Sequence, residues 1–149
     1  MKSEDFLTEG EIKPKNKIKN GYVVDIEKAT IENSNYRKVL FTSEIDQLVL
    51  MSLKPNEEIG MEKHDGAQFF RIEQGSGKVI INDKEHVITD GSAIVVPKGS
   101  EHNIINTGKE DLKLYTVYSP PQHKDGLVEK VKPSKKEDDA DVPERKRKK

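Results

Sequence analysis

Residues 91–106 read GSAIVVPKGSEHNIIN and join a short apolar run to a tight turn. The run at 93–96 has the length and the β-branched content of a buried strand. Pro97 fixes one backbone angle and Gly99 tolerates angles that other residues resist, so together they predict a turn directly after this strand. His102 then opens the returning strand. The segment therefore predicts a hairpin that places a histidine where it can meet other ligands across a barrel.

The rest of the middle of the chain repeats this pattern of short apolar runs separated by turns. The runs expected to be strands are 22–26, 36–42, 47–53, 68–72, 78–81, 85–89, 93–96, 103–106 and 112–118. Turn residues such as Pro55, Gly75 and Asn82 separate them at hairpin spacing. Many short strands about 8–12 residues apart are typical of an all-β sandwich or barrel. Only residues 6–7 and 125–132 hint at a helix.

Metal-binding side chains gather in the segment from Glu62 to Gln68. Side chains of a strand alternate between two faces, so Glu62 and His64 are expected to point the same way. Gln68 begins the next apolar strand and can lie on the same inner face. A carboxylate, an imidazole and an amide oxygen that converge form a site for a metal ion or a polar ligand. On local grounds alone, an exposed hairpin with ordinary surface polarity is the alternative.

The segment 91–106 resembles the second sequence motif of the cupin family. That motif reads G-x5-P-x-G-x2-H-x3-N, and its fixed positions are all matched here, by Gly91, Pro97, Gly99, His102 and Asn106. The resemblance covers about residues 45–120 and looks closest to small single-domain cupins grouped with mannose-6-phosphate isomerase. It implies a double-stranded β-helix, the cupin jelly-roll barrel, with one metal ion at its mouth.

The first cupin motif, G-x5-H-x-H-x3/4-E-x6-G, is matched less completely. His64 and Gly75 stand at its second histidine and closing glycine, whereas the first histidine, the glutamate and the opening glycine are replaced by Glu62, Gln68 and Asn56. The metal ligands that the resemblance implies are Glu62, His64, Gln68 and His102. One carboxylate is retained, so a divalent cation is still compensated, although Gln68 is a weaker ligand or binds substrate instead. Two histidines and one carboxylate also match the ligands of non-haem iron oxygenases.

The resemblance implies an enzyme that depends on a divalent metal and acts on a small polar substrate, such as a sugar or sugar phosphate. The ligand set does not distinguish Zn, Mn, Fe and Ni. Glu62 is the candidate catalytic residue of an isomerase, because a carboxylate that the metal does not fully engage can move a proton between carbons. An iron-dependent dioxygenase and a non-catalytic binding module are the alternatives. No inward Lys or Arg that would bind a phosphate stands out, and Tyr118 is expected to pack in the core.

Composition separates a folded middle from two charged ends. Of the 149 residues, 36% are charged and 32% are hydrophobic, against the usual ~25% and ~45–50%. We expect a flexible extension at 1–20, a barrel domain at 21–120 and a charged, disordered tail at 121–149, with both ends dispensable for folding. The apolar content of residues 21–60 exceeds what one small barrel needs and predicts a homodimer.

Several classes of protein are excluded by what the sequence lacks. The absence of cysteine excludes disulfides and thiolate catalysis and fits a reducing compartment. The longest purely apolar run, 48–51, is too short for a membrane helix, and an acidic N-terminus does not fit a secretory signal. A net charge of −1 gives no electrostatic case for nucleic acid, with the basic run 145–149 as a weak exception. We therefore expect a cytoplasmic protein that contacts no membrane.

Overall fold

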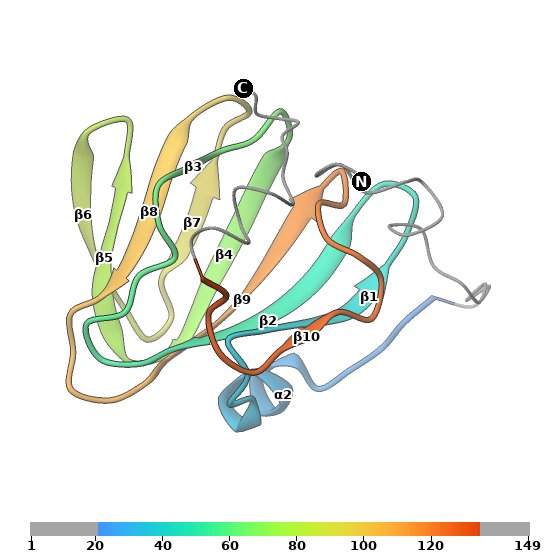
Figure 1. The fold of residues 1–149 in the computed structure, drawn as a ribbon, viewed down its shortest axis with the longest axis horizontal. Coiled ribbons are helices and arrows are strands. Elements are labelled where there is room, and N and C mark those ends of the chain that lie inside the picture. The colour runs from blue at the N-terminus through green and yellow to red at the C-terminus, as the bar shows by residue number, and fades with distance from the viewer. Residues whose placement is uncertain (1–20, 135–149) are drawn as a thin grey trace.

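The structure is a computed structural model that describes residues 21–134, and these residues form two antiparallel sheets that face each other (Figure 1). Its elements in chain order are α2 (Ile26–Glu32), β1 (Arg37–Thr42), β2 (Gln47–Leu53), β3 (Glu62–Lys63), β4 (Ala67–Gln74), β5 (Ser76–Ile81), β6 (Lys84–Thr89), β7 (Ala93–Val96), β8 (Glu101–Asn106), β9 (Leu112–Ser119) and β10 (Val128–Glu129). The larger sheet has the order β10-β1-β2-β9-β4-β7 and the smaller one β3-β8-β5-β6. The all-β jelly-roll predicted from the sequence is confirmed.

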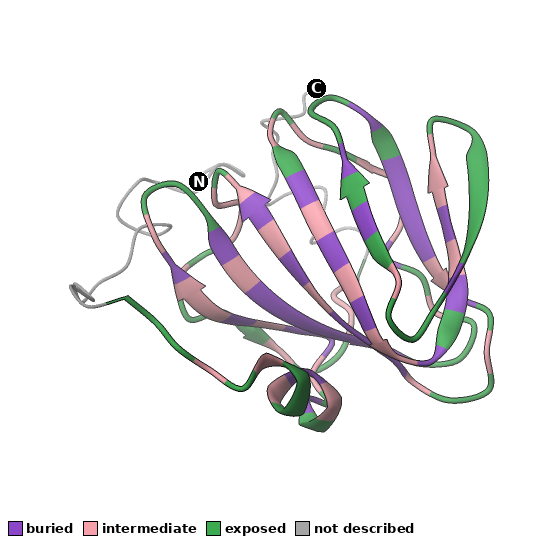
Figure 2. Cartoon of the chain, turned by 180° about the vertical axis from the view of Figure 1, so that it is seen from behind, coloured by how far each residue is buried: buried purple, intermediate pink, exposed green. Residues whose placement is uncertain are grey.

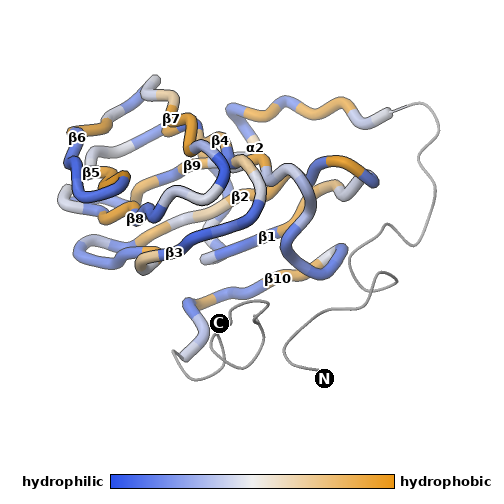
Figure 3. The backbone as a smooth tube through the Cα atoms, turned by 90° about the horizontal axis from the view of Figure 1, so that it is seen from above, coloured by the Kyte–Doolittle hydropathy of each residue, from blue (hydrophilic) through white to orange (hydrophobic). Residues whose placement is uncertain are grey.

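The register of the larger sheet sorts the barrel interior into layers, because directly opposed residues of antiparallel strands share a face. Buried and less buried residues alternate most clearly along β4 and β7 (Figure 2), and hydrophobic residues occur on strands of both sheets (Figure 3). One mostly apolar layer consists of Val49, Thr116, Phe70 and Ile94. The neighbouring layer is mostly polar and consists of Thr42, Gln47, Tyr118, Gln68 and Val96. The polar layer marks the end of the barrel that can hold a site.

The first expected strand, 22–26, is wrong, because the chain there is extended without sheet pairing and then enters α2. The side chain of Asp25 caps this helix by accepting a hydrogen bond from the backbone N–H of Lys28 at 3.2 Å. This cap satisfies a backbone N–H at the start of the helix, which has no partner within the helix. The helix contacts β2, β4 and β9 of the larger sheet, and its residue Thr30 is fully buried. Residues 21–134 contain no helix with the length and apolar character that a membrane crossing requires.

The expectation of a disordered tail from residue 121 is wrong for residues 121–134. β10 pairs antiparallel with β1, and Leu127 packs against the core. Gln47 Oε1 accepts the backbone N–H groups of Gln122 and His123 at 3.1 and 3.0 Å. The segment covers a strand edge that would otherwise be open, and a strand replaces the helix hinted at 125–132. The extension 1–20, the helix hint at 6–7 within it and the tail 135–149 lie outside the described residues.

Candidate metal centre

The residues singled out as ligands come from both sheets. Glu62 on β3 lies directly opposite His102 on β8, so the register itself puts these two side chains on one face. His64 follows the end of β3, and Gln68 belongs to the polar layer of the larger sheet. His102 is almost fully buried, whereas His64 and Glu62 are partly exposed. The group therefore has a closed inner side and an outer side that is open to solvent.

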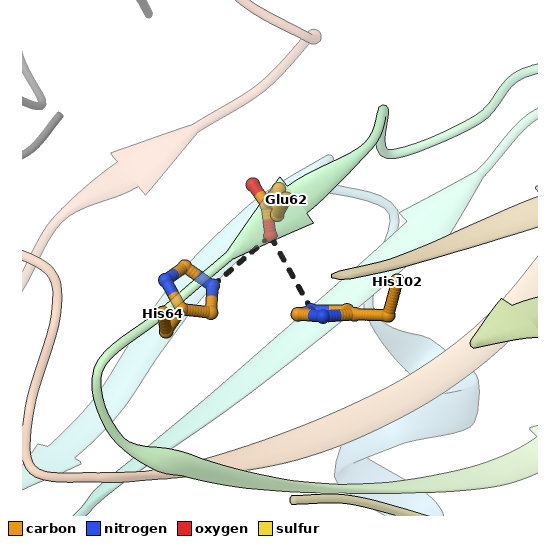
Figure 4. A group of neighbouring side chains, drawn as sticks. All are labelled: Glu62, His64 and His102. Carbon is orange, nitrogen blue, oxygen red and sulfur yellow. Dashed lines mark hydrogen bonds and ion pairs between the residues drawn. The ribbon is translucent and has the colours of Figure 1, made fainter. Parts of the chain in front are cut away.

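The side-chain atoms of Glu62, His64 and His102 converge on one point (Figure 4). Glu62 Oε1 lies 3.2 Å from His64 Nε2 and 3.9 Å from His102 Nε2. The ligand atoms of Glu62, His64 and His102 all lie within 4.8 Å of one another. Gln68 Oε1 lies 3.1 Å from His102 Nε2. The structure thus brings together all four residues that the sequence singled out.

Two glycines hold the backbone around these side chains. Gly99 has a φ of +81°, a conformation that favours glycine, and its N–H donates to the carbonyl of His64 at 3.0 Å. This hydrogen bond ties the predicted turn to the loop that carries the first histidine. A Cβ at Gly66 would lie 2.2 Å from the backbone oxygen of Ser119, so only glycine lets this loop approach the end of β9.

The neighbours of His102 hold its ring so that Nε2 faces the other candidate ligands. Its Nδ1 lies 3.2 Å from the carbonyl of Ser100 and its Nε2 lies 3.1 Å from Gln68 Oε1. The amide of Gln68 is oriented so that its nitrogen donates to Thr116 Oγ1 at 2.9 Å. When Nδ1 donates to the Ser100 carbonyl, the lone pair of Nε2 points toward Glu62 and Gln68. This is the tautomer that binds a metal ion, and the Ser100 carbonyl would fix the orientation of the ring.

The charges of the group also suit a cation. Burial alone would raise the pKa of Glu62, but the hydrogen bond and charge interaction with His64, assisted by Arg37 and His102, hold that pKa at about 2. Burial lowers the pKa of His102, and the charge of Glu62 opposes this only in part. A charged carboxylate and a neutral imidazole are the forms that bind metal ions.

Comparison with known proteins gives the family. The family model described as "Cupin domain" matches residues 49–118. An uncharacterized protein of Acanthamoeba polyphaga mimivirus, L612, is 46% identical over 117 residues, which cover 75% of this chain and 73% of that protein. The chain belongs to the cupin family.

Three further proteins are similar to parts of this chain. The crystal structure of BH2720 from Bacillus halodurans has a TM-score of 0.73 at 40% identity and is matched over 74% of this chain and 89% of its own. The uncharacterized protein YrkC of Bacillus subtilis is 47% identical over 118 residues, 74% of this chain, and this cupin spans 63% of its length. The mannose-1-phosphate guanylyltransferase of Klebsiella pneumoniae is 29% identical over 70 residues, which are 46% of this chain and 15% of that protein.

Sequence reasoning missed Arg37, which is buried inside this cupin and lies on β1 opposite Met51 of the core. Its Nη1 forms an ion pair with Glu129 of β10. Burial would lower the pKa of Arg37, but its interactions with Tyr118, Tyr36, Glu129 and Glu62 raise that pKa above its ordinary value. Alternation with Val39 would have placed Arg37 inside the barrel, but an arginine in an apolar run is ordinarily assigned to the solvent side.

Tyr118 and His123 form a second polar pair beside the candidate ligands. The ring of Tyr118 meets that of His64 edge-on with centroids 5.8 Å apart, and its hydroxyl lies 3.1 Å from His123 Nε2. Burial raises the pKa of the Tyr118 hydroxyl and lowers the pKa of His123 well below its ordinary value, so both groups are neutral near pH 7. From the sequence, His123 falls within the tail expected at 121–149. The local pattern does not predict that β10, which follows His123, pairs with β1.

Proposed function

We propose that this cupin binds one divalent metal ion through Glu62, His64 and His102, with Gln68 as a fourth ligand, and uses it on a small polar substrate. The observation that carries the proposal is the convergence of two imidazoles and a carboxylate, with the side-chain amide of Gln68 beside them. When bound, such an ion polarises a carbonyl or hydroxyl oxygen of the substrate. The partly exposed side of the group, at Glu62 and His64, leaves room for that oxygen.

The geometry favours Glu62 as a ligand more than as a proton carrier. One of its carboxylate oxygens faces both imidazoles and the other points away from them (Figure 4). A general base works best with a pKa near the working pH, and a pKa of about 2 makes this carboxylate a weak one. The name of the Klebsiella relative contains a sugar phosphate, which fits the substrate class that the sequence suggests, but it describes a guanylyltransferase and not an isomerase.

A second candidate activity is iron-dependent oxygenation. Two histidines and one carboxylate are the ligand set of non-haem iron oxygenases, which leave the remaining positions open. This reaction class does not depend on Glu62 as a base, so the low pKa of Glu62 does not weigh against it.

Elemental analysis of protein purified without chelator or added metal tests the proposal. We expect about one equivalent of a divalent metal per chain. Iron together with oxygen uptake would assign the oxygenase, and exchange of substrate protons with deuterated solvent on a sugar phosphate would assign the isomerase. Binding of metal and ligand without turnover would assign a binding module. Protein that neither carries nor takes up a metal ion would contradict the proposal.

The metal should be lost as the pH falls below about 6, because free histidine titrates near 6.5 and a ligand must be neutral. Burial lowers the pKa of His102, so protons compete at that ring only below the value of free histidine. Measuring metal content after equilibration between pH 8 and pH 5 should show this loss. Full occupancy at pH 5 would point instead to a site dominated by carboxylates, with exposed Asp65 or Glu101 recruited.

The homodimer and the cytoplasmic location that the sequence favours stay predictions. Light scattering of the purified full chain measures the first, with twice the mass of 16.9 kDa as the expected result.

A further inference from the structure

Arg37 is the buried charge that the candidate metal centre does not explain. Only 6% of its surface is exposed, and its place opposite Met51 puts the side chain inside the barrel. Nη1 is engaged by Glu129, but Nε is buried without a hydrogen-bond partner. A buried N–H that lacks an acceptor is costly, so it ordinarily has a partner in the working protein.

The guanidinium lies close to the candidate ligands. It interacts with the hydroxyl of Tyr118 and with the charge of Glu62, and Tyr118 in turn touches the ring of His64. One side chain therefore separates Arg37 from the residues that would hold the metal. Lys113, the other buried cation among residues 21–134, is turned to the outer face of the sheet and donates to the backbone oxygen of Asn33 after α2.

The charges around Arg37 leave an excess of one positive unit once a metal ion is bound. Glu62 and Glu129 each contribute one negative charge in their ion pairs and Arg37 one positive charge, while Tyr118 and His123 are hydrogen-bonded to each other. A divalent ion then changes the sum from −1 to +1. A ligand that carries a single negative charge would neutralise this interior, whereas a dianion would not.

We propose that Arg37 binds the carboxylate of a small hydroxy- or oxo-carboxylate whose neighbouring oxygen reaches the metal centre. The inference rests on the proposed metal site. Because Nη1 is held by Glu129, the edge of the guanidinium that carries Nε is the one left for a ligand. That edge presents two parallel N–H groups, which match the two coplanar oxygens of a carboxylate. Phosphate, with more charge and no second inward cation among the described residues, fits less well.

The test is titration of the cobalt-loaded full chain with lactate, followed by the visible absorption of Co²⁺. Lactate should change the spectrum with a saturable affinity, and propane-1,2-diol, which keeps the hydroxyl but lacks the carboxylate, should not. Arg37→Met should weaken lactate binding by about 10- to 100-fold, the effect of a lost charged hydrogen bond. Arg37→Lys should bind lactate with an affinity between those of the wild type and Arg37→Met, since it keeps the positive charge but loses the two parallel N–H groups.

Arg71→Met is the matched control. Arg71 also has a buried Nε without a partner, but it alternates with Gln68 and Phe70 onto the outer face and is 40% exposed. This variant should bind lactate as the wild type does. The double variant Arg37→Met/Glu129→Met removes both charges and separates loss of the ligand from damage to β10.

The outcomes decide the inference. The inference would be overturned if Arg37→Met bound lactate as the wild type does, or if the wild type gave no response to lactate up to high concentration. It would also be overturned if inorganic phosphate, and not lactate, gave a response that depends on Arg37. If the wild type takes up no cobalt, the metal proposal has failed. The carboxylate proposal, which rests on the metal, then fails with it, whereas cobalt uptake without a lactate response overturns the carboxylate proposal alone.

Discussion

Replacing His102 with alanine should remove most of the bound metal from this cupin, and so should replacing His64. The two histidines reach one point from different elements, and each places Nε2 near the same oxygen of Glu62. Losses of 10- to 100-fold in metal affinity follow the removal of groups that merely orient ligands, so the loss of a ligand should be at least that large. Metal content of each purified variant, measured after dialysis against trace metal, gives the answer.

The two other histidines are the matched controls. His86 is exposed on β6, away from the site, and His86→Ala should keep the wild-type metal content. His123 contacts the hydroxyl of Tyr118 and does not belong to the converging group of Glu62, His64 and His102, so His123→Ala should keep the metal as well. If His86→Ala lost the metal while His64→Ala kept it, the assignment of ligands would be wrong even in an intact cupin fold.

A chain that ends at residue 124 should be strongly destabilised, in contrast to the expectation from composition. The truncation removes β10 and the packing of Leu127, and it leaves the buried Arg37 without Glu129. Breaking one buried ion pair costs about 3–5 kcal/mol, which for a domain of this size lowers the melting temperature by on the order of 10 °C or more. Thermal unfolding followed by circular dichroism measures the change.

A chain that ends at residue 134 is the comparison for this experiment. It keeps β10 and removes only charged sequence that cannot support a core, so its melting temperature should stay within a few degrees of the full chain. Glu129→Gln, which keeps the strand but removes the negative charge, should fall between the two truncations. Equal melting temperatures for the chains ending at 124 and 134 would show that β10 does not stabilise the barrel.

The turn and the shared face of Glu62 and His64 could be predicted because their signals are local, whereas the barrel and the meeting of all four side chains were implied by the resemblance to the cupin motifs. Pro97 and Gly99 are required by the turn itself, and Gly99 indeed adopts a φ of +81°. Period-2 alternation placed Glu62 and His64 on one face, and the structure brings these residues within hydrogen-bond distance. Such features depend on the backbone within a few residues, which the sequence shows directly.

The parts that could not be predicted depend on contacts between distant segments. β10 is a strand only because β1 offers it an open edge about 90 residues earlier in the chain. Arg37 is inside only because Glu129 of that strand reaches it. The helix α2 was missed for another reason: the apolar, β-branched residues at 22–26 outweighed the single capping signal of Asp25.

Anomalous X-ray scattering from crystals of the metal-loaded protein tests the central claim most directly. The account predicts one peak per chain, about 2.0–2.2 Å from His64 Nε2, from His102 Nε2 and from an oxygen of Glu62, the distances usual for such ligands. It also predicts that Gln68 Oε1, now 3.1 Å from His102 Nε2, turns toward that peak. A peak elsewhere in the chain, or none among these residues in crystals grown with excess metal, would contradict the account.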